Sequence, residues 1–86
     1  MGTKSEPALF DCHAIAMPDE PTFTLLARDP HAPEVVRDWA DRRLMAITLK
    51  MRPPQDMEKV REALECAYSM ERWRLLNDGA WRNLHE

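Results

Sequence analysis

The clearest hydrophobic pattern in the chain repeats with the period of an α-helix over about residues 30–51. Its apolar face is formed by Val35, Val36, Trp39, Ala40, Ala46 and Ile47, and charged side chains cover the opposite face. Asp29 is a good N-cap and Pro30 suits the first helical position, where its missing N–H does no harm. The segment 44–49 also fits a short strand, but no breaker separates it from the helix. The proline pair at 53–54 ends the predicted helix, because it pushes the preceding residue out of the helical region.

A second helical pattern covers about residues 56–77 and is apolar around more of its circumference. Its main stripe consists of Met57, Val60, Leu64, Ala67, Tyr68 and Leu75, and an adjacent stripe consists of Ala63, Cys66, Met70 and Trp73. Together they exceed the ~100° arc of a helix that packs on one side only. We therefore expect this helix to pack on two sides, one towards its own domain and the other towards a tail, a second copy or a partner.

The N-terminal part of the chain has strand-like features. Residues 22–27 are rich in β-branched and aromatic side chains, and a turn signal at 18–21 separates them from residues 9–17, whose alternation is imperfect and leaves strand and helix open. Because a lone strand leaves its backbone groups unpaired, we expect a hairpin of the two segments. The predicted fold class is α+β and helix-dominated, with a short N-terminal strand or β-hairpin followed by two antiparallel amphipathic helices.

The length of 86 residues predicts a single domain over residues 1–86, with a flexible segment at residues 1–8. A chain this short buries only roughly 60–65% of its unfolded surface, so self-association would add useful core. Two cysteines make no disulfide framework, and we see neither a signal peptide nor a run of ~18 apolar residues. We expect a cytoplasmic protein that does not enter a membrane.

The net charge of −3 is unevenly distributed along the chain. Residues 1–34 carry two basic and six acidic side chains, for a net charge of −4, whereas the rest carries ten basic and nine acidic ones, for +1. No basic stripe is present, so we do not expect direct binding to nucleic acid. Asp11, Asp19 and Glu20 are candidates for contact with a basic protein surface, where they would mimic phosphates; the alternative is a solvated acidic terminus.

Candidate catalytic chemistry is sparse. The cysteines and histidines show no metal-ligand spacing, and the carboxylates are scattered among basic neighbours. With glycine only at Gly2 and Gly79, the chain has no phosphate-binding loop. We expect no enzymatic activity, no metal site and no cofactor.

Candidate partner-binding residues lie along the second apolar stripe and the C-terminal tail. Met70, Trp73, Arg74 and Trp81 suit protein binding or self-association, because tryptophan and arginine are enriched at interface hot spots. The same residues equally suit a tail packed on its own helix. Arg43 interrupts the apolar face of the first helix, where it either extends its charged end to solvent or contacts a partner.

The segment Phe23–Ala40, with the sequence FTLLARDPHAPEVVRDWA, resembles a unit of small uncharacterised proteins from alphaproteobacterial phages and prophages. The segment Ala63–Arg74 resembles the helix that accompanies it, and the two cover 30 of the 86 residues. This resemblance implies a small inhibitor that binds and disables a host protein complex, most specifically an anti-CRISPR protein that blocks a CRISPR–Cas effector. One alternative is a small regulatory or structural module that forms a homodimer and has no CRISPR role. The other is a nucleic-acid-binding regulator.

Overall fold

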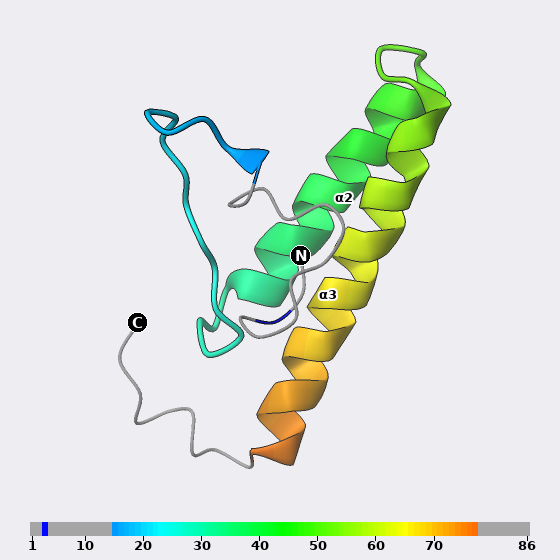
Figure 1. The fold of residues 1–86 in the computed structure, drawn as a ribbon. Coiled ribbons are helices and arrows are strands. Elements are labelled where there is room, and N and C mark those ends of the chain that lie inside the picture. The colour runs from blue at the N-terminus through cyan, green and yellow to red at the C-terminus, as the bar shows by residue number, and fades with distance from the viewer. Residues whose placement is uncertain (1–2, 4–14, 78–86) are drawn as a thin grey trace.

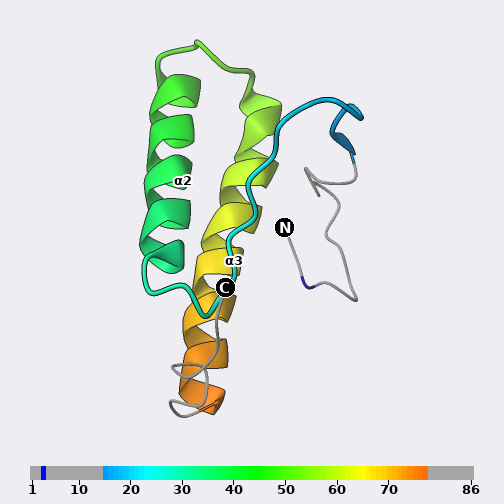
Figure 2. The same cartoon turned by 90° about the vertical axis from the view of Figure 1, so that its left-hand side faces the viewer.

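The computed structural model of the protein describes residue 3 and residues 15–77. The elements in this part are helix α2 (Ala32–Thr48), the short 3-10 helix η1 (Pro54–Asp56) and helix α3 (Met57–Leu76). Figures 1 and 2 show α2 and α3 side by side and antiparallel, joined at one end by the turn that contains η1. Helices were expected over about 30–51 and 56–77, so both observed helices are slightly shorter than the sequence pattern.

Helix α2 begins at Ala32 because the chain first makes a turn around Asp29. The Asp29 carboxylate accepts a hydrogen bond from the backbone N–H of His31 (2.8 Å), and the Asp29 carbonyl accepts one from Ala32 (3.1 Å). Pro33 then lies in the first turn of the helix, where no N–H is needed, and Glu34 complements the positive end of the helix dipole. The N-cap residue is His31, so Asp29 stabilises the start of the helix from a position two residues before the N-cap.

Helix α2 ends at Thr48, before the proline pair is reached, through a Schellman motif. The backbone N–H of Lys50 donates to the Ile47 carbonyl (3.0 Å) and that of Met51 to the Ala46 carbonyl (2.8 Å). Lys50 has a φ of 61°, the left-handed conformation that usually selects glycine. The ambiguous segment 44–49 is helical up to Thr48, so it contributes the last turn of α2.

The predicted α+β fold class is wrong, because the described residues contain no β-strand. Residues 22–27 run in an irregular conformation, and residues 17–20 form a turn closed by the Glu20 N–H and the Met17 carbonyl (3.0 Å). The rest of the first expected strand, residues 9–14, lies outside the described part. Residues 22–27 have side chains that favour a strand, but no strand lies among the described residues to pair with them. Instead Leu25 packs against the helices.

The core lies between the two helices and consists of small side chains. Its buried members are Val36, Ala40, Val60, Ala63 and Ala67, and Leu25, Trp39, Ile47 and Met70 pack around them partly buried. Alanines on both helices let the two backbones approach closely. Among the described residues, no large side chain is fully buried.

Candidate protein-binding surface

The most prominent exposed feature of α3 is a row of large apolar side chains, which we call the outer stripe. It consists of Met57, Leu64, Tyr68 and Leu75, whose residues are 37, 44, 61 and 81% exposed. Spacings of seven, four and seven residues keep these side chains on one face of the helix. The sequence pattern had grouped them with Val60 and Ala67, but these two turn towards α2 and are buried.

Two charged side chains occupy the gaps in the outer stripe. Arg61 lies between Met57 and Leu64, and Glu71 lies between Tyr68 and Leu75, both at helical spacing. Arg61 pairs with Glu58 one turn earlier on the same helix (3.2 Å), and Glu71 pairs with Arg37 of α2. Both side chains keep about half or more of their surface in solvent, at 64% for Arg61 and 47% for Glu71. Their charged groups are therefore accessible to a molecule docked on the outer stripe.

Most of the candidate residues in and beside the second apolar stripe make contacts within their own chain. Met70 packs against the core, and Cys66 is half-buried. Arg74 donates from Nε to the carbonyl of Ala27 (2.7 Å) and from Nη2 to the carbonyl of Asp29, so it holds the segment before α2 against α3. Trp73 is the exception, because it is 37% exposed, as much as Met57 of the outer stripe. Trp81 lies outside the described residues.

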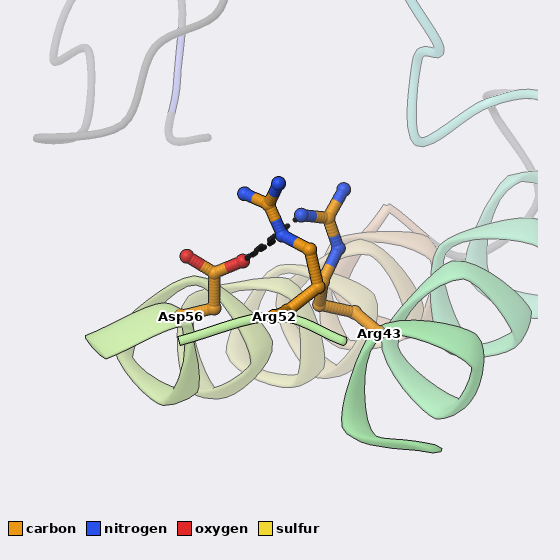
Figure 3. A network of polar contacts seen from close by, with 3 residues as sticks. All are labelled: Arg43, Arg52 and Asp56. Atoms are coloured by element: carbon orange, nitrogen blue, oxygen red, sulfur yellow. Dashed lines mark hydrogen bonds and ion pairs between the residues drawn. The ribbon is translucent and has the colours of Figure 1, made fainter. Parts of the chain in front are cut away.

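Arg43 belongs to a polar cluster at the end of the helix pair where the turn that contains η1 joins α2 to α3 (Figure 3). Its Nη1 donates to Asp56 Oδ2 (3.0 Å), and Arg52 Nε donates to the same oxygen (2.7 Å). The Arg43 guanidinium also lies over the Trp39 ring, 5.0 Å from its centre, which is a cation–π contact. The Asp56 side chain is only 7% exposed, so these contacts satisfy a buried carboxylate and fix the turn to α2.

The electrostatics of this cluster favour the charged form of Asp56. The hydrogen bond from Arg52 lowers the pKa of the Asp56 carboxyl below its ordinary value of 3.8. Burial opposes this shift, and the hydrogen bond from Arg43 and the positive charges of Arg52 and Lys59 reinforce it. The structure thus gives Arg43 contacts within its own chain at the hairpin turn.

The acidic candidates lie on a separate part of the surface. Asp19 and Glu20 are exposed in the turn at residues 17–20, where Glu20 Oε1 accepts a hydrogen bond from the backbone N–H of Met17 (3.1 Å). Both views in Figures 1 and 2 show this turn standing away from α2 and α3. Asp11 lies outside the described residues. The structure therefore does not bring Asp19 and Glu20 together with the outer stripe.

Groups that could support chemistry are scattered in the part of the chain described. No set of three or more His, Cys, Asp or Glu side chains there is arranged to hold a metal ion. Burial raises the pKa of the Cys66 thiol, which lowers the share of reactive thiolate at neutral pH. An open hollow along α2 is lined by Glu34, Val35, Arg37, Asp38 and Asp41, most of them charged and solvated.

No family model, no curated protein and no solved structure matches this chain. Neither α2 nor α3 is both long and apolar enough to cross a membrane.

Proposed function

We propose that this protein acts by stoichiometric binding to another protein chain, not by catalysis, and that the outer stripe is its contact surface. The supporting observation is an inverted distribution of apolar side chains. Small alanines and valines fill the core between α2 and α3, whereas Leu64, Tyr68 and Leu75 lie on the outside. Single exposed apolar residues are normal, but several large ones aligned on one helical face are typical of an interaction site.

The composition and spacing of the outer stripe fit recognition of an apolar helix or groove. Methionine, tyrosine and arginine are enriched at protein interfaces, and Met57, Tyr68 and Arg61 supply one of each. Anchors that recur on one helical face are the usual means by which a helix docks into a hydrophobic groove. The contact would bury the apolar side chains at the centre and leave Arg61 and Glu71 to set the orientation.

Site-specific photo-crosslinking tests this proposal. Tyr68 is replaced by p-benzoylphenylalanine, and the same replacement at Arg42, whose side chain is 80% exposed on α2, is the matched control. After irradiation of cells that carry the native gene, we expect a covalent protein adduct from position 68 and none from position 42. Equal labelling at both positions, or no adduct at position 68, would refute the outer stripe as a binding surface.

A narrower form of the proposal is a phage-encoded inhibitor of a CRISPR–Cas effector that acts in the host cytoplasm. Its support is the resemblance of the segments Phe23–Ala40 and Ala63–Arg74 to phage proteins, together with a binding mode that needs no catalysis. The test is a plaque count on a CRISPR-immune host that expresses the wild type or the Tyr68→Asp variant. We expect plaques with the wild type only, and immunity that is unchanged by the wild type would exclude the inhibitor.

A further inference from the structure

The order of residues along the outer face of α3 is symmetric about residue 66. Met57 and Leu75 lie nine residues to either side of it, Arg61 and Glu71 lie five to either side, and Leu64 and Tyr68 lie two to either side. An antiparallel helix of the same sequence would therefore place apolar opposite apolar and basic opposite acidic side chains at each level. This self-complementarity is the requirement for an isologous contact, in which both copies use the same surface.

We infer that two copies of this chain associate through their outer stripes, with the two α3 helices antiparallel and a two-fold axis level with residue 66. The inference rests on the proposed function, since it names a second copy of the chain as the protein that covers the outer stripe. In the pair, Leu64 of each copy contacts Tyr68 of the other, and Met57 contacts Leu75. These contacts cover the four apolar side chains of the outer stripe, which are among the large apolar residues that one copy leaves exposed.

The spacing of these six positions supports helix-to-helix packing in particular. Residues 57, 61, 64, 68, 71 and 75 alternate steps of four and three, which is the seam of a coiled coil. Such a seam packs against a second helix at a shallow crossing angle of roughly 20°. The seam extends along nearly the whole of α3 (Met57–Leu76), and α2 occupies the neighbouring face through Val60, Ala63 and Ala67.

The charges select the antiparallel orientation. In that orientation Arg61 of each copy faces Glu71 of the other, so two attractive pairs form about the axis. A parallel pair would instead place Arg61 against Arg61 and Glu71 against Glu71. Glu71 already pairs with Arg37 of its own chain and Arg61 with Glu58, so the contact joins two existing ion pairs into a four-residue network.

Glu65 provides an internal test of the register. It lies on the edge of the seam opposite α2, one residue from the axis, so the two copies of Glu65 face each other. Like charges at this position oppose association, and we expect the Glu65→Gln variant to associate more tightly than the wild type. If the apolar faces associated without a fixed register, the two copies of Glu65 would not face each other, and Glu65→Gln would not have this effect.

The decisive experiment is a charge swap between two variants, measured by sedimentation equilibrium. The wild type is expected to reach twice the chain mass of 10.0 kDa with rising concentration. Arg61→Glu and Glu71→Arg each place like charges at both contacts, and each alone is expected to weaken association at least about tenfold. Mixed in equal amounts, the two variants present opposite charges to one another and are expected to pair again. Circular dichroism of each variant checks that its helices remain folded.

Two further variants separate the apolar contact from general effects of added charge. Tyr68→Asp is expected to weaken association about 30-fold or more, because it removes a central aromatic contact. Arg42→Asp, on the exposed surface of α2, is expected to leave association unchanged. A wild type that remains monomeric up to about 1 mM, or variants that fail to pair when mixed, would overturn the inference.

Spin labels report the orientation directly. In a background with Cys12→Ser and Cys66→Ser, labels at Glu65→Cys should lie almost level across the axis. In the antiparallel pair, position 58 of one copy is level with position 74 of the other. The two labels at Glu58→Cys are therefore 16 residues apart along the helix axes, which corresponds to about 24 Å. Equally short distances at both positions would indicate a parallel pair and refute the register. A photo-adduct from position 68 with a different protein, without a self-adduct, would refute self-pairing and leave the proposed function standing.

Discussion

Replacement of Ala67 by leucine tests whether α2 and α3 meet through small side chains. Ala67 and Ala63 are completely buried, and Ala40 on the facing helix is almost so. Leucine adds three carbon atoms where both backbones are already close. Overpacking of this kind typically destabilises by about 1–3 kcal/mol. In a domain of this size each kcal/mol lowers the melting temperature by about 4–8 °C, so we expect a fall of about 4–24 °C.

The matched control is Ser69→Leu, which lies two residues further along the same helix and is exposed. It adds a similar volume without touching α2, so the expected change is within about 0.5 kcal/mol. Both variants are unfolded by heat and by urea under far-ultraviolet circular dichroism. All samples have one low protein concentration, because self-association would add stability by mass action. An Ala67→Leu variant as stable as the wild type would show that the helices do not touch at the alanines.

Three further predictions concern groups outside the outer stripe. Asp56→Asn is expected to lower the free energy of unfolding near neutral pH. Because the pKa of the Asp56 carboxyl is lower in the folded chain than its ordinary value of 3.8, the charged carboxylate stabilises the fold above about pH 3.8, and this stabilisation is lost as the pH falls through the pKa of the folded state. The unfolding curves of the wild type and the variant should therefore converge in acid. Arg74→Met keeps the apolar stem but removes two hydrogen bonds to backbone carbonyls, and we expect it to destabilise by about 1–2 kcal/mol and to increase amide exchange in residues 22–29 most strongly. In a Cys12→Ser background, alkylation of Cys66 should require a higher pH in the folded chain than in urea, and identical pH profiles would contradict its burial.

The helices could be predicted because their signal is local and repeated. Apolar residues at helical spacing and charged residues on the opposite face indicate the element whatever its neighbours are. The end of α2 was harder to place, since it depends on Lys50 adopting a left-handed backbone conformation that lysine does not favour. The proline pair at 53–54 was a reasonable stop signal, but the Schellman motif ends the helix at Thr48, before it.

The strand prediction failed because the conformation of residues 22–27 depends on distant partners. A composition of threonine, phenylalanine and leucine suits a pleated surface, but only when another strand is available to pair with it. In the described part of the chain, the segment is fixed by Leu25 on the core and by Arg74, which reaches the carbonyls of Ala27 and Asp29 from more than 40 residues away. No local pattern encodes a contact between an arginine side chain and a backbone carbonyl at that separation.

The outer stripe illustrates what a helical pattern can and cannot show. The wide apolar arc of α3 leads us to expect more than one apolar face, but it does not show which part of the arc α2 covers. Residue size decides this: Ala63 and Ala67 allow α2 to approach closely, and the larger Leu64 and Tyr68 are left beside the contact. In a chain that functioned alone, folding would favour the reverse, because larger side chains gain more from burial. Small residues inside and large ones outside are the arrangement expected when the larger residues are buried by a second protein, and the symmetric order about residue 66 makes a second copy the partner to test first.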